Sequence, residues 1–424
     1  MSVAAANDFP LLFRVPRSDF RIRFLVVPHL YLHVPFCARR CSYCDFSIAV
    51  RKHVPAREYV DAVLRELDWL QNSPGWANPG AMPRGTPWGN AEPPTQVSGA
   101  DPGLDTLYLG GGTPSLLPPD ALTSLLRSLL DAFPSTPSLD AVEVTLEANP
   151  EDVTLEHATA WRRAGVNRVS LGAQSFDDRV LRWMHRSHDA ARIGDAVGIL
   201  RRAGIANVSL DLIFALPVEL GRDWARDLDH ALALEPSHLS LYGLTVEQRT
   251  PLARWISRGA ATAPDDERYA AEYLQAHVRL TTCSYRFYEV SNAARDGRRS
   301  RHNAAYWSGR PYLGCGPAAH SFDGRVRRWN LAAWEAYRRA VAAGRSPIES
   351  EEALSDEQRE LERVYLSLRT DAGLPLSACP PDRLAAWAGQ GWVEVRGGRV
   401  VCTPEGWLRL DALVSDLTGR HATA

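Results

Sequence analysis

The chain has 424 residues, more than one small domain usually contains. Hydrophobic residues make up 45% of the sequence and charged residues 23%, a composition that excludes a disordered chain. The 48 basic side chains nearly balance the 50 acidic ones and leave a net charge of −2, so no nucleic-acid partner is predicted. We therefore expect a soluble protein with one large unit and a smaller one.

The first residues, 1–26, are interpreted as an N-terminal extension. Pro10, Arg14 and Pro16 interrupt them, which does not fit the apolar run of a secretory signal. The most apolar stretch, Phe24–Phe36, contains further prolines and is shorter than the roughly 20 residues that a membrane helix needs. The sequence therefore predicts no membrane span and a cytoplasmic location.

Short apolar runs alternate with helix-length segments over residues 27–345. Six runs are predicted to be buried strands: Leu30–Val34, Leu104–Leu109, Val142–Leu146, Val166–Leu171, Val208–Ile213 and Leu239–Leu244. Parallel strands need crossover connections, so this alternation predicts an α/β sheet, open or partly closed as a barrel. An internal repeat supports it, since Arg162–Leu171 resembles Arg201–Leu210 and each copy reads as a helix end, a glycine cap and a strand.

Two segments depart from this alternation. Residues 73–103 are rich in Pro, Gly, Asn and Ala without a sustained period, and predict a loop insertion in the first crossover. Residues 346–424 predict a small winged-helix-like α+β domain. Its expected elements are helices at Asp356–Leu368, Pro380–Ala388 and Pro404–Leu417 and a hairpin formed by Trp392–Val395 and Arg399–Cys402. Mixed charge on these helices favours a structural role over DNA binding.

Three of the seven cysteines lie within eight residues, in a Cys-x-x-x-Cys-x-x-Cys pattern after the first predicted strand. This clustering of Cys37, Cys41 and Cys44 favours a metal site over a disulfide framework. A structural zinc ion would need a fourth ligand, for which only His33 and His53 are near. A four-iron cluster held by three thiolates would keep one iron open to a substrate. The combination of this spacing with the preceding strand favours iron–sulfur over zinc.

The cysteine spacing, together with the strand before it, resembles the radical S-adenosylmethionine (SAM) superfamily. The resemblance implies a partial (β/α)6 TIM-like barrel, a [4Fe-4S] cluster on Cys37, Cys41 and Cys44, and SAM bound at the open iron. It also implies SAM contacts along one rim of the barrel. The positions that carry over are Tyr31, Tyr43, Gly111, Gly112, Thr113, Glu147, Gln174, Arg186 and Asp211.

Physical chemistry supports several of these positions. A glycine-rich segment lets backbone amides approach a ligand closely, and an arginine fork suits the two oxygens of a carboxylate. The alternatives are a tight βα turn for Gly111 and Gly112, and an N-cap or salt bridge for Glu147. One departure from the family pattern is Ala215–Glu219, where side chains replace two glycines of the usual Gly-Leu-Pro-Gly-Gln.

From His33 to Phe322 the chain resembles the branch that contains oxygen-independent coproporphyrinogen III dehydrogenase and the HemW-type heme chaperones, and the resemblance extends into the C-terminal domain. Phe46 stands where the dehydrogenase has a further cysteine, as in the chaperones. His302 opens a His-Asn-x-x-Tyr-Trp string that is typical of the chaperones. The resemblance therefore implies His302 as a candidate axial ligand to heme, for which imidazole is common.

The alternative is that His302 caps a turn while Tyr306 and Trp307 pack the domain seam. His320 and Cys315 are weaker candidates for the heme ligand.

Two functions from different classes follow from this resemblance. The first is a heme chaperone that binds heme, a [4Fe-4S] cluster and SAM and transfers the heme to an acceptor, such as a respiratory heme protein. The second is radical oxidative decarboxylation of coproporphyrinogen III in porphyrin biosynthesis, which Phe46 argues against. Another radical SAM enzyme is a third reading. The resemblance also implies homodimer formation.

Overall fold

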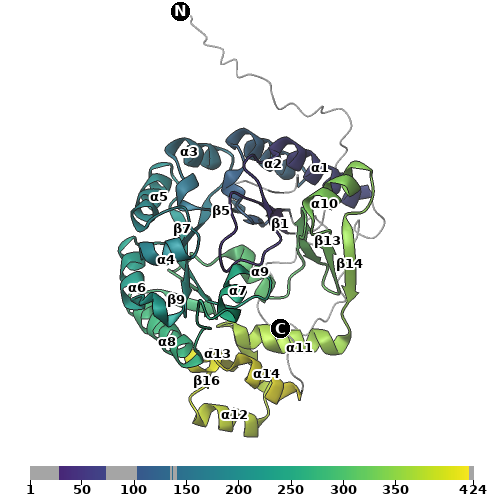
Figure 1. The fold of residues 1–424 in the computed structure, drawn as a ribbon. Helices are drawn as coiled ribbons and strands as arrows, with labels where there is room; N and C mark the ends of the chain where they lie inside the picture. The colour runs from purple at the N-terminus through teal and green to yellow at the C-terminus, as the bar shows by residue number, and fades with distance from the viewer. Residues whose placement is uncertain (1–27, 73–102, 134–135, 137–140, 420–424) are drawn as a thin grey trace, which may run out of the picture.

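The computed structural model describes residues 28–72, 103–133, 136 and 141–419. The expected extension at 1–26 and nearly all of the expected insertion at 73–103 lie outside these residues. A nine-stranded sheet forms the centre, in the order β11-β1-β4-β5-β6-β7-β8-β10-β9 (Figure 1). Its strands are β1 (His29–Val34), β4 (Thr106–Gly111), β5 (Glu143–Ala148), β6 (Arg168–Gln174), β7 (Asn207–Phe214), β8 (His238–Gly243), β9 (Arg286–Glu289), β10 (Asn292–Ala294) and β11 (Leu313–Cys315).

All six predicted strands are present, and the strands from β11 to β8 run parallel, whereas β10 pairs antiparallel with both β8 and β9. The two edge strands, β11 and β9, do not pair with each other in the described chain, so the barrel is partial, as expected. Parallel strands end on the same side of a sheet, and the loops that follow them therefore converge there.

Helices cover the outer face of this sheet and follow one another around the rim in Figure 1. They are α1 (Ala56–Asn72), α2 (Pro119–Asp131), α3 (Leu155–Arg163), α5 (Ala190–Arg202), α6 (Trp224–Ala233) and α8 (Asp266–Thr282), with the short α4 (Asp178–Trp183) and α7 (Pro251–Ser257) near the loops. Several begin with an aspartate whose carboxylate accepts a backbone N–H of the first turn, as Asp189 does for α5. The predicted glycine caps are confirmed, since Gly165 and Gly204 have φ values of 110° and 86°.

A second, three-stranded sheet follows the barrel strands. It consists of β12 (His320–Phe322), β13 (Val326–Asn330) and β14 (Ile348–Ala353), with α9 (Arg301–Trp307) and α10 (Trp334–Ala342) nearby in the sequence. Strand β14 lies after the expected boundary at 346, yet it pairs with β13. The strand therefore belongs to the sheet before the boundary, because its hydrogen-bonding partner lies there and sequence periodicity does not reveal pairing.

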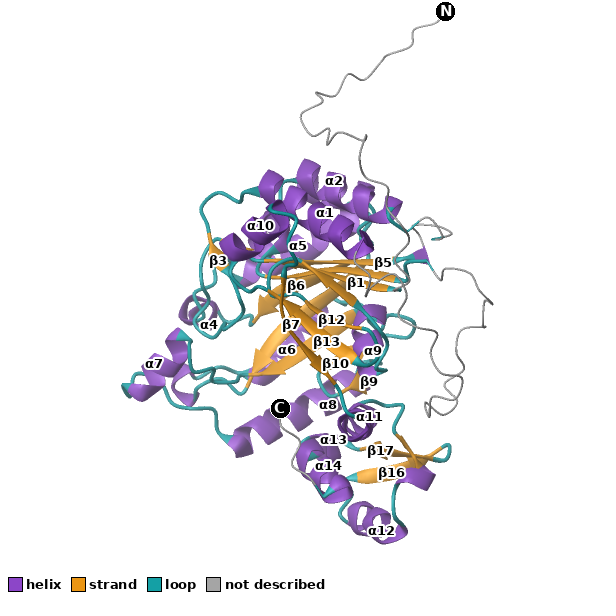
Figure 2. Cartoon of the chain, turned by 90° about the vertical axis from the view of Figure 1, so that its right-hand side faces the viewer, coloured by secondary structure: helices purple, strands orange, loops and turns teal. Residues whose placement is uncertain are grey.

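The remaining C-terminal elements lie together at the bottom of Figure 2. They are α11 (Asp356–Arg369), β15 (Leu374–Pro375), α12 (Pro381–Gly389), β16 (Val393–Arg396), β17 (Arg399–Cys402), α13 (Pro404–Trp407) and α14 (Leu410–Thr418). The expected hairpin is present, and β15 extends it to three strands.

The prediction of a single helix at Pro404–Leu417 is wrong, because the helix is interrupted after α13 and a separate helix, α14, follows. A Cβ at Gly406 would lie only 1.9 Å from the Trp392 carbonyl oxygen, and the Trp407 indole donates to the Leu368 carbonyl at 3.0 Å. These contacts fix α13 against the hairpin and against α11. Within the described residues, no helix is long and apolar enough to cross a bilayer.

Candidate functional site

The cysteine motif begins at the end of β2 (Phe36–Cys37) and continues in the loop before β3 (Ala49–Val50). The glycine-rich segment after β4 fixes this loop: the Gly112 amide donates to the Val34 carbonyl and the Thr113 amide to the Phe36 carbonyl, both at 2.8 Å. The Thr113 hydroxyl also donates to Cys37 Sγ at 3.3 Å. A Cβ at Gly112 would lie 2.7 Å from the Phe36 carbonyl oxygen, so only glycine permits this approach.

A cavity of about 420 Å³ lies over this loop, at the side of the sheet where the parallel strands end. It is called the cysteine cavity below. It brings together all the sequence-predicted cluster and SAM residues except Tyr31. These are Cys37, Cys41, Tyr43, Cys44, Gly111, Gly112, Thr113, Glu147, Gln174, Arg186 and Asp211.

Arg186 spans the cavity from the loop after α4. Its Nη2 donates to Asn149 Oδ1 at 2.6 Å and to the Gly172 carbonyl at 2.9 Å, and its Nη1 lies 3.7 Å from Cys41 Sγ. Its Nε is buried and has no hydrogen-bond partner in the described chain. A buried donor without a partner is costly, so this nitrogen suits a carboxylate of a bound ligand.

Two carboxylates lie deeper in the barrel. Glu147 accepts hydrogen bonds from the Tyr108 hydroxyl at 2.8 Å and the Gly111 amide at 3.1 Å, and burial raises its pKa to about 7. Asp211 accepts from the Ser170 hydroxyl at 3.0 Å, and burial raises the pKa of Asp211 as well. Both groups are therefore hydrogen-bonded inside the barrel and do not form ordinary surface ion pairs.

Sequence reasoning missed further residues that line this cavity, among them Asn149, Ser170 and Tyr242. A signal for two of them was present. Asn149 follows Glu147 in the same predicted strand end, and Ser170 shares the inward face of β6 with Gln174 because side chains alternate along a strand.

The departure at Ala215–Glu219 does not remove the turn that glycine usually permits. Ala215 itself adopts φ 56°, and its amide donates to Glu272 Oε2 at 2.7 Å. A left-handed alanine is strained, and this buried carboxylate stabilises it.

The three cysteines lie on one loop at the rim of the cysteine cavity. Among the described residues, no three His, Cys, Asp or Glu side chains form a group that could hold a single metal ion. Burial raises the pKa of Cys44 to about 11 and also raises the pKa of Cys37. A nearby positive charge, such as that of a bound metal, would be needed to convert these thiols to thiolates at neutral pH.

Tyr31 was expected to contact SAM, but in this structure it lies outside the cysteine cavity. It precedes His33 by two residues on the same face of β1, which places it roughly 6.6 Å further from the cysteine loop. Its hydroxyl lies 3.2 Å from His33 Nδ1, and it lines a second cavity together with Tyr306. The strand register sets the depth of Tyr31 in the barrel, and the sequence motif alone could not predict that depth.

His302, expected to ligate heme, lies buried near the start of α9. Its Nδ1 lies 2.7 Å from Thr106 Oγ1 and its Nε2 lies 2.8 Å from the Tyr306 hydroxyl. Burial lowers the pKa of His302 well below its ordinary value. Both nitrogens are occupied and the ring lines neither cavity, so the residues do not fit the expected heme ligation.

The position of Trp307 agrees with the alternative that this residue packs the domain seam. The Arg369 guanidinium of α11 lies 4.2 Å from the centroid of the Trp307 ring, across the seam between α9 and the C-terminal elements.

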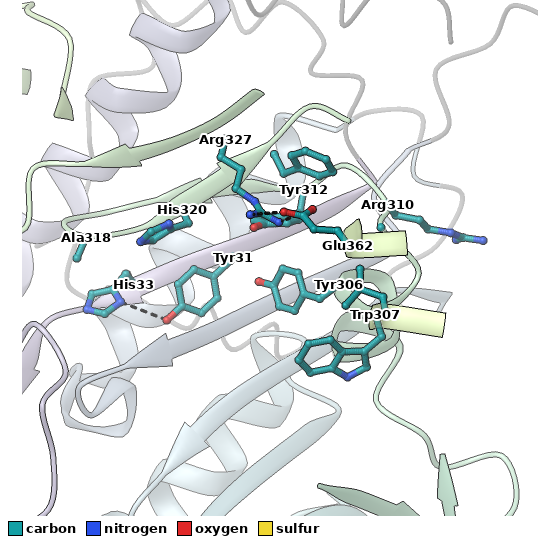
Figure 3. Close-up of a pocket in the computed structure, with 13 residues that line it drawn as sticks. Tyr31, His33, Tyr306, Trp307, Arg310, Tyr312, Ala318, His320, Arg327 and Glu362 are labelled. Carbon is teal, nitrogen blue, oxygen red and sulfur yellow. Dashed lines mark hydrogen bonds and ion pairs between the residues drawn. The ribbon is translucent and has the colours of Figure 1, made fainter. Parts of the chain in front are cut away.

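The second cavity has a volume of about 390 Å³ and lies between β1, α9, the β12–β13 hairpin and α11. It is called the aromatic cavity below, and Figure 3 shows its lining. The side chains drawn include Tyr31, His33, Tyr306, Trp307, Arg310, Tyr312, His320, Phe322, Arg327 and Glu362. Cys315 is fully buried in β11 and lines neither cavity, so the weaker heme-ligand candidate Cys315 is not accessible.

Comparison with known proteins agrees with this geometry. Residues 95–231 match the Radical SAM superfamily, which implies a [4Fe-4S] cluster and SAM. The solved structure of coproporphyrinogen III oxidase (HemN) from Escherichia coli, a radical SAM enzyme, aligns with a TM-score of 0.71 and 23% sequence identity. The alignment covers 92% of this chain and 89% of that chain, and it confirms the predicted fold.

Relatives found by sequence share a higher identity with this chain than the HemN structure does. Proteins named heme chaperone HemW are 37% identical over 421 residues in Mycobacterium tuberculosis, covering 98% of this chain and 99% of the relative. The corresponding Bacillus subtilis protein is 31% identical over 344 residues, which cover 81% of this chain and 84% of the relative. The Escherichia coli protein is 35% identical over 304 residues, which cover 70% of this chain and 72% of the relative. With this identity along nearly its whole length, the chain belongs to the HemW family of the radical SAM superfamily.

Proposed function

We propose that this chain is a heme chaperone, which binds heme and transfers it to an acceptor protein while the cysteine cavity holds a [4Fe-4S] cluster and SAM. The observation that carries the proposal is the match over 98% of the chain to a relative named heme chaperone HemW. The two cavities support it, because such a protein needs one site for the cluster and SAM and another for heme.

The residues of the cysteine cavity fit the cluster and SAM. Cys37, Cys41 and Cys44 would supply the thiolates, and a reduced cluster would supply one electron to SAM. The unpaired Nε of Arg186 would bind the SAM carboxylate. Glu147, whose pKa lies near 7, has one oxygen on Tyr108 and one on the Gly111 amide, and it would orient the ligand next to the glycine segment.

The two cavities share a wall, formed by the His33 ring. His33 lines the aromatic cavity, and a Cβ at Gly111, which lines the cysteine cavity, would lie 2.6 Å from His33 Cε1. His33 Nε2 also lies 3.2 Å from the carbonyl oxygen of Ser47, three residues after Cys44. A conformational change in the cysteine loop would therefore alter the aromatic cavity through the His33 side chain.

Phe46 argues against the alternative function, coproporphyrinogen III dehydrogenase. Its side chain lies at the cysteine cavity and is 61% exposed, at the position where the dehydrogenase has a further cysteine. Four other cysteines lie in the described chain, and none of them lines this cavity: Cys283, Cys315, Cys379 and Cys402.

One anaerobic experiment tests the proposal. Reconstituted protein should contain roughly four irons per chain and a Cys37→Ala/Cys41→Ala/Cys44→Ala variant none. The wild type should also bind one heme per chain and pass it to the heme-free form of a respiratory cytochrome. Conversion of coproporphyrinogen III with release of 5′-deoxyadenosine, absent in the triple variant, would instead establish the dehydrogenase. Absence of heme binding in cluster-loaded protein would refute the chaperone. The respiratory acceptor, the homodimer and the cytoplasmic location stay predictions.

A further inference from the structure

The aromatic cavity contains a histidine that the structure leaves available. Of the two histidines that line it, His33 has both ring nitrogens near partners, Tyr31 and the Ser47 carbonyl oxygen. His320, on β12, is exposed, and its ring has no hydrogen-bond partner in the described part of the chain. Its ring stacks on Trp329, with centroids 5.9 Å apart, which limits its rotation. His320 therefore presents a free imidazole at the cavity.

The walls of this cavity suit a flat apolar ligand. Five aromatic side chains line it: Tyr31, Tyr306, Trp307, Tyr312 and Phe322. Tyr306 and Tyr312 contact each other edge to face, with centroids 4.5 Å apart. Aromatic rings offer large apolar faces to a planar macrocycle.

Two arginines line the cavity, and they differ in how their charge is balanced. Arg327 pairs with Glu362 of α11 through two contacts of 2.7 and 2.8 Å, so its charge is already balanced. Arg310 is exposed and forms no ion pair among the described residues. Figure 3 shows His320 and Arg310 toward opposite ends of the lining. This arrangement separates a metal-binding end from an end that would meet carboxylates.

We propose that the aromatic cavity is the heme-docking site of this chain, with His320 as the axial ligand to the iron and Arg310 as a partner of the propionates. The inference rests on the proposed chaperone function and replaces His302 as the ligand. A volume of about 390 Å³ is near the lower end of the range of roughly 300–1,000 Å³ for ligand sites. A cavity of this volume would hold part of the macrocycle and would leave the rest accessible to an acceptor.

The test is titration of the cluster-loaded full-length protein with ferric heme, followed by absorption and electron paramagnetic resonance. His320→Gly should change the Soret band and raise the heme Kd by more than roughly tenfold, the lower bound known for losing an outer-sphere partner of a metal ligand. Added imidazole should restore the spectrum. His53→Gly, at an exposed histidine outside the cavity, is the matched control and should behave as the wild type.

A second variant tests the propionate end. Arg310→Glu should weaken binding of heme and leave binding of heme dimethyl ester unchanged, because the ester lacks the carboxylates. Equal weakening of both ligands would overturn the role of Arg310.

The outcomes separate this inference from the proposed function. If the wild type binds no heme, the chaperone proposal itself fails. If it binds one heme and His320→Gly retains the wild-type spectrum and Kd, only the docking site is wrong. Loss of the spectrum in His302→Gln alone, with an unchanged melting temperature, would also overturn the assignment of His320.

Discussion

Glu66 provides a quantitative test of how one buried carboxyl group makes the stability of the fold depend on pH. Its carboxylate is buried where α1 meets α10 and the ends of β11 and β13. It accepts hydrogen bonds from the Gly316 amide at 2.7 Å and the Tyr337 hydroxyl at 2.6 Å, and the Asn330 side-chain amide donates to its other oxygen. Burial raises the pKa of Glu66 to about 7, although these three hydrogen bonds favour the ionised form.

The sign of the pH dependence follows from this raised pKa. The unfolded chain loses the Glu66 proton near its ordinary pKa of 4.5, whereas the folded protein keeps it up to about 7. In that interval the folded state binds more protons, so the free energy of unfolding falls by about 1.4 kcal/mol per pH unit as the pH rises. Between pH ~5.5 and pH ~8 the loss is about 2 kcal/mol. Glu66→Gln abolishes this titration, so its destabilising effect should be about 2 kcal/mol larger at the lower pH.

Urea unfolding of the wild type and Glu66→Gln at both pH values measures this difference. Tryptophan fluorescence is a suitable signal, because the Trp334 ring lies 6.1 Å from that of Tyr337. Glu58→Gln, at an exposed position of α1, controls for removing a carboxylate from the same helix. An equal cost of Glu66→Gln at both pH values would refute the reasoning.

Two further substitutions probe the wall between the cavities and the turn after β7. Gly111→Ala should lower SAM binding by at least roughly tenfold in equilibrium dialysis. Gly111 has φ 106°, and the Cβ of an alanine there would collide with the His33 ring. Unchanged binding would show that the glycine-rich segment can shift to accommodate the methyl group. Arg222→Met should destabilise the fold by about 3–5 kcal/mol in urea unfolding, because it removes the 3.4 Å ion pair of the buried Asp227 and leaves Glu272 with Arg268 as its charged partner. A loss below about 1 kcal/mol would contradict that role.

Six parallel strands of the central sheet and most of the cysteine cavity could be predicted from the sequence, whereas β9, β10 and β11 were not. Apolar runs separated by helix-length segments define strands locally, and parallel strands bring their carboxyl ends to one side. Residues placed at those ends, such as Thr113 and Gln174, therefore meet although they are far apart in the chain. Short motifs sufficed for this site because each motif begins where a strand ends.

Other features depend on contacts between distant segments. The pairing of β14 with β13 and the break after α13 are set by backbone partners that have no local pattern. Tyr31 lies in the aromatic cavity because strand register fixes its depth in the barrel.

The choice between His302 and His320 as the heme ligand also separates what is local in the sequence from what depends on tertiary contacts. The sequence by itself determined the strands, the cysteine motif and the residues around it, because periodicity and motif position are local properties. Only the tertiary structure decided which imidazole is free: Thr106 and Tyr306, from separate elements, occupy both nitrogens of His302, whereas His320 is exposed and has no such partners in the described chain. Hydrogen-bond partners of this kind come from the packing of distant segments, which a linear motif does not encode.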